Sequence, residues 1–222
     1  MSAAAAAGGA SAAANVVGRA TMEGMEMGAA RAMSSVDNDS VQIDWNDFNY
    51  PPLLHVVHYE PGELPSSICG MVKCQNAFFG GMFMGCTANL CNTVIILFAH
   101  SGVPGKWLLY SLLNCIIFCS AAFATFFTGY KGLATNDSGS VWRFKLMQGA
   151  AAILCLLLGL VPWGCTNGLA KLGARDEYSG GKVYWDLAIV FESIVFLVTA
   201  LVGAYNVYKA QTYDPYAVAG SG

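Results

Sequence analysis

Long apolar stretches separated by short polar gaps dominate the chain from about residue 77 onward. Four of these stretches are long enough to cross a membrane: residues 77–99, 107–129, 144–164 and 184–208. About 20 apolar residues, each adding about 1.5 Å, span the ~30 Å hydrocarbon core of a bilayer. Because lipid offers no hydrogen-bond partners, each stretch is predicted to form a helix, which pairs its backbone amides internally. The pattern predicts an all-α membrane protein with four transmembrane helices.

Aromatic residues stand at both ends of the last three stretches. Indole and phenol rings prefer the headgroup layer, where one edge of the ring is hydrated and the other lies in hydrocarbon. The residues at these ends are Trp107 and Tyr130, Trp142 and Trp163, and Tyr184 and Trp185 with Tyr205 and Tyr208. Their placement supports the span limits independently of hydropathy.

An even number of spans places both ends of the chain on the same side, and short connections predict two antiparallel hairpins. Residues 100–106 and 165–182 then lie on the opposite side. Cationic residues near the spans are Lys73, Lys131, Arg143, Lys145 and Lys209 on the side of the ends, against Lys106, Lys171, Arg175 and Lys182 opposite. This small excess favours cytosolic termini.

Composition agrees with a membrane protein. The 222 residues are 55% hydrophobic and 11% charged, whereas a soluble domain has about 25% charged residues. The Ala/Gly-rich residues 1–43 predict a disordered cytosolic tail, and residues 209–222 a second cytosolic tail. No basic stripe is present that could neutralise phosphates, so a nucleic-acid partner is not expected.

Residues 44–76 form a distinct segment before the membrane domain, residues 77–208. Pro51, Pro52, Pro61 and Pro65 forbid a continuous helix up to residue 65. Beyond Pro65, either a short interfacial helix that turns into the first span or an irregular linker is expected. Two cysteines beside the first span, Cys69 and Cys74, are candidate palmitoylation sites.

Metal and catalytic chemistry find little support. His55 and His58 are followed by Glu60 and Glu63, but zinc needs three or four ligands in fixed geometry, and the intervening Pro-Gly argues against a rigid frame. No Ser, Cys or carboxylate stands at a recognisable catalytic spacing from the three histidines. We expect no enzyme, metal or cofactor.

Glu192 is the one carboxylate well inside a span. Placing an acid at mid-bilayer costs about 2.5–3.5 kcal/mol, so it should face other helices. Its possible partners are Asn89, Asn92, Asn114 and Gln148. A hydrogen bond that joins helices and a proton or ion pathway are both compatible with this position.

Gly81 and Gly85 form a Gly-x-x-x-Gly pattern in the first span. Missing side chains let a second helix approach closely, either within the molecule or in a homo-oligomer. The sequence does not choose between the two.

The gap between the second and third spans contains two candidate contact sites. Tyr130, Lys131 and Leu133 belong to a Tyr-x-x-Leu pattern of the kind that trafficking adaptors read as an extended strand, although Tyr130 also suits an interfacial aromatic position. Lys131, Arg143 and Lys145 could contact anionic lipids, each contributing about 1 kcal/mol.

The order of several short motifs resembles the secretory carrier membrane protein family over about residues 45–208. That family has an Asn-Trp-Pro-Pro motif and a His/acidic stretch ending in Glu-Ile-Pro before four spans. The matching residues here are Asn49, Tyr50, Pro51 and Pro52, then His58, Glu63, Leu64 and Pro65, and in the third span Gln148 and the closing Pro162, Trp163 and Gly164. The family's Asn-Pro-Phe repeats are missing.

The resemblance implies cytosolic termini, no catalysis and a role in post-Golgi traffic, in secretory and endocytic carriers. It implies residence in the Golgi or trans-Golgi network, endosomes, transport vesicles or the plasma membrane. Expected partners are the bilayer, anionic phosphoinositides, trafficking adaptors and further copies of the chain. The alternatives are a small proton- or solute-conducting protein built around Glu192 and a MARVEL-type vesicle tetraspan.

Overall fold

The computed structural model describes residues 43–99, 104–172 and 182–213. In this part of the chain one short 3-10 turn precedes four long helices and there is no strand. The elements are η1 (Pro61–Glu63), α2 (Ser66–Ala99), α3 (Lys106–Ala134), α4 (Ser138–Leu160) and α5 (Lys182–Thr212). The all-α prediction is confirmed. The predicted N-terminal tail lies almost wholly outside the described residues, as does most of the C-terminal one.

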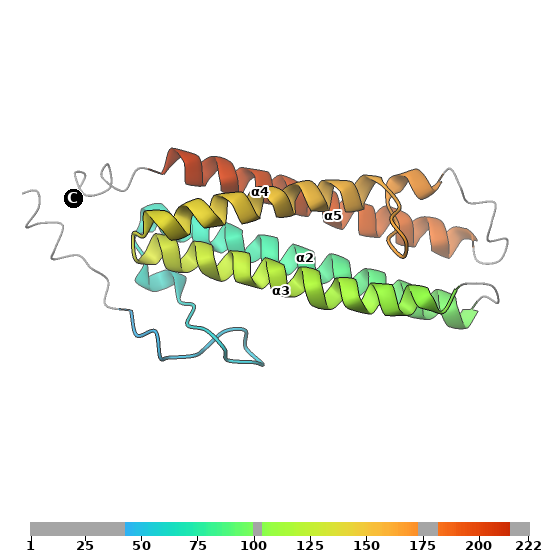
Figure 1. Ribbon diagram of the computed structural model, residues 1–222, viewed down its shortest axis with the longest axis horizontal. Helices are drawn as coiled ribbons and strands as arrows, with labels where there is room; N and C mark the ends of the chain where they lie inside the picture. Colours follow the sequence, from blue (N-terminus) through green and yellow to red (C-terminus); the bar gives the residue numbers. More distant parts are fainter. Residues whose placement is uncertain (1–42, 100–103, 173–181, 214–222) are drawn as a thin grey trace, which may run out of the picture. The chain divides into compact units, whose positions relative to one another are not determined.

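The four helices run alongside one another as two antiparallel hairpins, α2 with α3 and α4 with α5 (Figure 1). Each helix packs against two neighbours, because α2 also contacts α5 and α3 also contacts α4. We call the end where α2 begins and α5 ends the proximal end, and the other the distal end. All four helices are long and apolar enough to cross a membrane.

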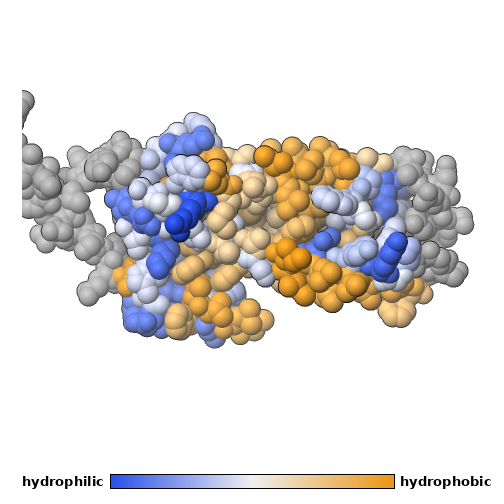
Figure 2. Space-filling model, in the orientation of Figure 1, coloured by the Kyte–Doolittle hydropathy of each residue, from blue (hydrophilic) through white to orange (hydrophobic). Residues whose placement is uncertain are grey.

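Surface hydropathy follows the same axis. On the face drawn in Figure 2, hydrophilic residues gather towards the two ends of the described helices and hydrophobic residues cover the length between them. Large apolar side chains stay exposed along the helices, among them Phe98, Ile153 and Leu201. A surface of this kind suits lipid, so this is an integral membrane protein with four spans.

The first span begins earlier than expected. Both alternatives for the residues after Pro65, a separate interfacial helix and an irregular linker, are wrong, because α2 runs without a break from Ser66. No proline interrupts it, and Ile68, Met71 and Val72 are buried against α3, α4 and α5 rather than lying on an interface. Burial of this apolar face extends the helix beyond the stretch that hydropathy marks.

The α3–α4 turn is short and well capped. Asn136 adopts a left-handed conformation with φ 52°, and Asp137 caps α4 by accepting bonds from the backbone N–H groups of Gly139 and Ser140. The bonds from Ser140 and Gly139 hold the pKa of Asp137 below its usual value. A tight turn here places α3 and α4 side by side.

The third span ends earlier than expected. Val161, the residue before Pro162, is extended with φ −107° and ψ 127°, because proline disfavours a helical conformation in its predecessor. Residues 161–164, including Trp163 and Gly164, therefore belong to the α4–α5 connection and not to the helix.

Candidate functional site

Glu192 of α5 is fully buried and accepts three hydrogen bonds from side-chain amides. Asn92 Nδ2 donates to Oε1 at 2.5 Å and Asn167 Nδ2 donates to the same oxygen at 3.0 Å. Asn89 Nδ2 donates to Oε2 at 3.0 Å. Two donors come from α2 and the third from the α4–α5 connection. The carboxylate thus joins three parts of the chain.

Each of the three amides is held in this orientation by a donor on its other side. Ser111 Oγ donates to Asn89 Oδ1 at 2.7 Å, and the Tyr184 hydroxyl donates to Asn92 Oδ1 at 2.6 Å. Lys171 Nζ donates to Asn167 Oδ1 at 2.8 Å. An amide whose oxygen accepts on one side must present its NH₂ on the other. We call these seven residues the Glu192 network: Asn89, Asn92, Ser111, Asn167, Lys171, Tyr184 and Glu192.

The network satisfies both carboxyl oxygens of Glu192. All three bonded amides are donors, and the oxygens of a carboxyl group accept hydrogen bonds. These bonds offset part of the cost of burying a polar group among the helices.

The α4–α5 connection folds back into the bundle to complete the site. Asn89 Nδ2 also donates to the Cys165 carbonyl at 2.9 Å, and Ser193 Oγ donates to the Asn167 carbonyl at 3.0 Å. A Cβ at Gly168 would lie 2.6 Å or less from the backbone of Val161, so only glycine allows this close passage. Residues 165–168 of the connection are therefore part of the core.

Lys171 brings a positive charge to the distal end of the network. Its Nζ lies 4.7 Å from the ring centroids of both Trp107 and Trp185. Cation–π contact with two indoles holds the ammonium beside the amide of Asn167, through which it reaches Glu192.

Two of the four predicted partners of Glu192 are confirmed. Asn89 and Asn92 bond to it, but Asn114 and Gln148 do not. Asn114 Nδ2 instead donates to Cys165 Sγ at 3.4 Å. Sequence reasoning missed Asn167, because it assigned residues 165–182 to a loop outside the membrane. It also missed Ser111, Lys171 and Tyr184, which orient the three amides. The sequence marks each of them only as a polar side chain in or near a span.

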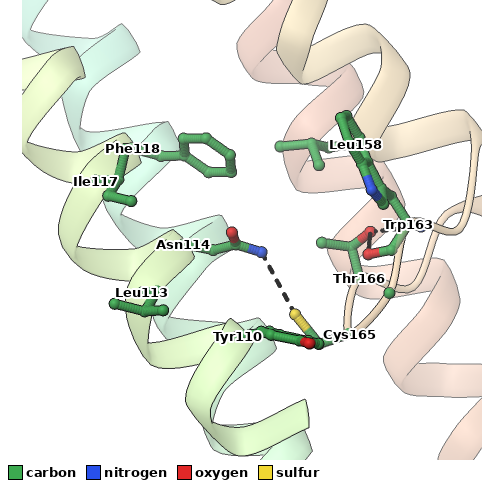
Figure 3. Close-up of a pocket in the computed structure, with 10 residues that line it drawn as sticks. Tyr110, Leu113, Asn114, Ile117, Phe118, Leu158, Trp163, Cys165 and Thr166 are labelled. Carbon is green, nitrogen blue, oxygen red and sulfur yellow. Dashed lines mark hydrogen bonds between the residues drawn. The ribbon is translucent and has the colours of Figure 1, made fainter. Parts of the chain in front are cut away.

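A cavity of about 400 Å³ lies between α3 and α4 next to this site (Figure 3). Asn114 reaches towards Cys165 on one side, and Leu158 and Trp163 face α3 from the other. The lining is mostly apolar and carries no ionisable carboxylate or amine: Tyr110, Leu113, Asn114, Ile117, Phe118, Leu158, Trp163, Gly164, Cys165 and Thr166. The cavity suits an apolar chain rather than an ion.

An apolar layer separates the Glu192 network from the proximal half of the core. It consists of Phe78, Met82, Cys86, Ala122, Cys155, Leu158, Phe196 and Ala200. On the proximal side of this layer lie three buried amides, Gln75, Gln148 and Asn206. Within the described residues, the side chains of Gln75 and Gln148 have no hydrogen-bond partner. Buried carboxyl and amide side chains therefore occupy two separate levels of the bundle.

The family-like motifs before α2 fold together on the proximal ends of α2 and α3. The Tyr50 hydroxyl donates to Asn76 Oδ1 at 2.6 Å, and Asn49 Oδ1 accepts from the Tyr59 N–H at 2.8 Å. The Tyr130 hydroxyl accepts from the Glu60 N–H at 3.3 Å. Rings of this segment pack against α2 and α3 in a cluster of Trp45, Tyr50, Tyr59, Phe79, Phe123, Phe126 and Tyr130.

His58 links two parts of the same segment, Asp47 and Glu63. Its Nε2 lies 2.8 Å from Glu63 Oε2, and its Nδ1 lies 3.1 Å from the Asp47 carbonyl oxygen. Burial lowers the pKa of His58, but the bond to Glu63, the bond to Asp47 and the charges of both acids outweigh it and raise the pKa. Leu64, next to Glu63, is buried in the proximal core.

Both interpretations of Tyr130 are wrong. Residues 130–133 lie inside α3, where Tyr130 and Leu133 are buried, so no extended Tyr-x-x-Leu strand is available to an adaptor. Tyr130 also lies in the protein core and not in a headgroup belt. Lys131 is exposed, with its Nζ 5.8 Å from the Trp45 ring centroid, and Arg143 is exposed too, while Lys145 is half-buried.

Gly81 and Gly85, the pair of the Gly-x-x-x-Gly pattern, serve packing within the molecule. A Cβ at Gly81 would collide with Thr199 Oγ1, and one at Gly85 would lie 2.8 Å from the Phe196 ring, both on α5. The intramolecular alternative is therefore the one that the fold uses. Palmitoylation of Cys69 and Cys74, both half-buried at the proximal end, stays a prediction.

Comparison with protein-family models, with curated proteins and with solved structures finds no match to this chain, so its function is inferred below from its own residues.

Proposed function

We propose that this protein organises membrane in post-Golgi vesicle traffic, acting in secretory and endocytic carriers through lipid and partner contacts and without catalysis. The observation that supports it most is the folded segment before α2. The residues that resemble the secretory carrier membrane proteins, Asn49–Pro52 and His58–Pro65, pack as one unit on the proximal ends of α2 and α3. These two motifs, which follow each other in the sequence, thus form one folded surface.

The proximal end also has the charge for an anionic membrane surface. Lys73, Lys131, Arg143 and Lys209 are exposed near this end. Each basic residue beside an anionic leaflet contributes about 1 kcal/mol, so together they favour a cytosolic proximal end and contact with phosphoinositide headgroups.

A buried carboxylate inside a span favours a second candidate, proton or solute conduction through Glu192. Two features weigh against it. Every bonded amide of the network is fixed by a second donor, so the carboxylate has no exchangeable partner among them. The apolar layer around Phe78, Met82 and Phe196 then interrupts any polar path towards the proximal end. Glu192 therefore fits a structural role, in which it links α5 to α2 and to the α4–α5 connection, better than a role in conduction.

The test combines imaging with transport. The full-length tagged protein is expected on Golgi-derived and endosomal membranes, and its depletion is expected to slow secretion or endocytic uptake of a bulk cargo. A purely mitochondrial location would overturn the trafficking proposal. In reconstituted vesicles, no proton flux above that of empty vesicles is expected; a flux that Glu192→Gln abolishes would establish conduction instead.

A further inference from the structure

The segment before α2 contains a hairpin with an apolar tip. Tyr50 and Val57 pair in an antiparallel bridge, and the chain reverses between them. We call residues 48–57 the proline hairpin. Its large apolar side chains are strongly exposed: Leu53 94%, Leu54 71%, Phe48 54% and Val56 50%. Adjacent exposed apolar side chains of this size mark a surface that binds something.

The position of the hairpin along the bundle identifies what surrounds it. The Tyr50 ring centroid lies 5.5 Å from that of Phe126 and 6.4 Å from that of Phe79. Phe126 lies five residues distal to Lys131 on α3, and Phe79 six residues distal to Lys73 on α2. The Tyr50 hydroxyl also bonds to Asn76, three residues distal to Lys73. At about 1.5 Å per residue, Tyr50 is roughly 5–8 Å deeper than the exposed lysines.

The tip lies deeper still. Figure 1 shows the hairpin below the bundle, with its turn pointing along the long axis of the helices towards their middle. Lys73 and Lys131 carry charges that stay in water or among headgroups. The turn that contains Leu53 and Leu54 therefore extends beyond the level of these charges, towards the depth that the apolar face of an interfacial helix reaches.

Most backbone N–H groups of the proline hairpin are paired, which lowers the cost of placing it among lipids. Non-helical chain avoids lipid because unpaired amides are costly there. In residues 49–57, Pro51 and Pro52 have no N–H, and the N–H groups of Asn49, Tyr50, Leu54, His55, Val56 and Val57 all donate to backbone carbonyls of the same segment. Leu53 is the remaining residue of this stretch, and its N–H makes no such bond.

The distribution of charged residues along the hairpin also suits a tip placed among lipids. Residues 51–57 read Pro-Pro-Leu-Leu-His-Val-Val and carry no carboxylate, lysine or arginine. The acids Asp44, Asp47, Glu60 and Glu63 all lie outside this stretch, towards the open end of the hairpin. His55 is its single polar side chain, and an imidazole has an apolar body that tolerates the boundary between headgroups and acyl chains.

We propose that the proline hairpin inserts its tip, Leu53 to Val56, into the proximal leaflet, where the acyl chains of the bilayer cover it. This inference rests on the four spans and the depth of Tyr50, and it does not depend on the trafficking proposal. A protein partner on the same surface is the competing occupant, and the test below distinguishes the two.

The test compares Leu53→Cys with Ser138→Cys in the full chain, each in phosphatidylcholine vesicles with no other protein. Ser138 is exposed at the start of α4 on the same proximal side, so the comparison is independent of the orientation of the molecule in the vesicle. A membrane-impermeant maleimide labels both, and mass spectrometry of the peptides separates the new sites from the eight native cysteines. We expect labelling at position 53 to be at least tenfold slower.

A second measurement uses the unaltered chain and a phosphatidylcholine with a photoreactive diazirine on its acyl chain. Adducts are expected on the peptide that contains residues 51–56 and not on the turn at residues 135–137. Equal maleimide rates at the two positions would overturn the proposal and favour a surface that awaits a protein partner. Slow labelling without lipid adducts would also overturn it, because a contact other than lipid would then shield the tip.

Discussion

Glu192 illustrates how far residue-level reasoning reaches. The cost of an acid in a span predicts that it must be bonded, and Asn89 and Asn92 are three residues apart on one face of α2, which explains why both reach it. Asn167 and Lys171 could not be predicted. Their positions depend on how the α4–α5 connection re-enters the bundle, and hydropathy contains no information on that path.

Replacing the carboxylate by an amide should destabilise the fold. In Glu192→Gln an NH₂ takes the place of one acceptor oxygen and faces a donor from Asn89, or from Asn92 and Asn167. The substitution removes a buried hydrogen bond and brings the new NH₂ donor face to face with an amide donor. Together these effects should lower the free energy of unfolding by about 1–3 kcal/mol. Unfolding in mixed micelles by titration with dodecyl sulfate measures it. Leu201→Met, at an exposed position of the same helix, is the control and should change little.

The His58–Glu63 pair predicts a pH dependence. Because the folded pKa of His58 is raised, its contribution is complete below the ordinary value of about 6.5 and is lost as the pH rises through the folded pKa. Amide protection factors of residues 57–63, corrected for intrinsic exchange, should therefore fall as the pH rises above about 6.5 and through the folded pKa. Glu63→Gln should flatten this change. Protection in the unaltered chain that is independent of pH would contradict the assignment.

At the scale of elements, the number and type of helices could be predicted but several of their ends could not. Apolar length alone predicts four helices. The start of α2 depends on tertiary burial of Ile68 and Met71, which a membrane hydropathy pattern does not contain. The end of α4 could have been predicted at Val161, because the residue before a proline leaves the helical region.

Close packing of α2 on α5 leads to a paired prediction. Gly81→Ala adds a methyl group where Thr199 already lies, so the two helices must separate, and a loss of about 1–3 kcal/mol is expected. Gly80→Ala, the adjacent residue, meets nothing within 4 Å and should be neutral or stabilising by up to about 1 kcal/mol. The same micelle unfolding assay compares them. Equal effects of the two substitutions would contradict the packing described here.

For the whole molecule, the two ends of the bundle are closed in different ways. At the distal end, residues 165–172 of the α4–α5 connection fold back into the bundle, where Asn167 donates to the buried carboxylate and Lys171 donates to Asn167. The proximal end is covered by the segment before α2, held by aromatic rings and by His58. The bundle itself follows from the sequence. The way its two ends are closed does not, because residues 165–182 were expected outside the membrane and the segment before the first span as an interfacial helix or a linker.

Orientation of the whole molecule can be tested with its own glycosylation sequences. Asn38-Asp39-Ser40 and Asn136-Asp137-Ser138 both fit the Asn-x-Ser acceptor pattern, and both belong to the proximal side by the parity of the spans. If that side is cytosolic, as proposed, neither site meets the lumenal glycosylation machinery, so endoglycosidase should not change the mobility of the unaltered protein. Glu177→Asn places an acceptor before Tyr178-Ser179 in the distal connection, and this variant should gain one endoglycosidase-sensitive glycan. A glycan on the unaltered chain that Asn38→Gln removes would reverse the orientation, while glycans on both sides would be incompatible with four spans.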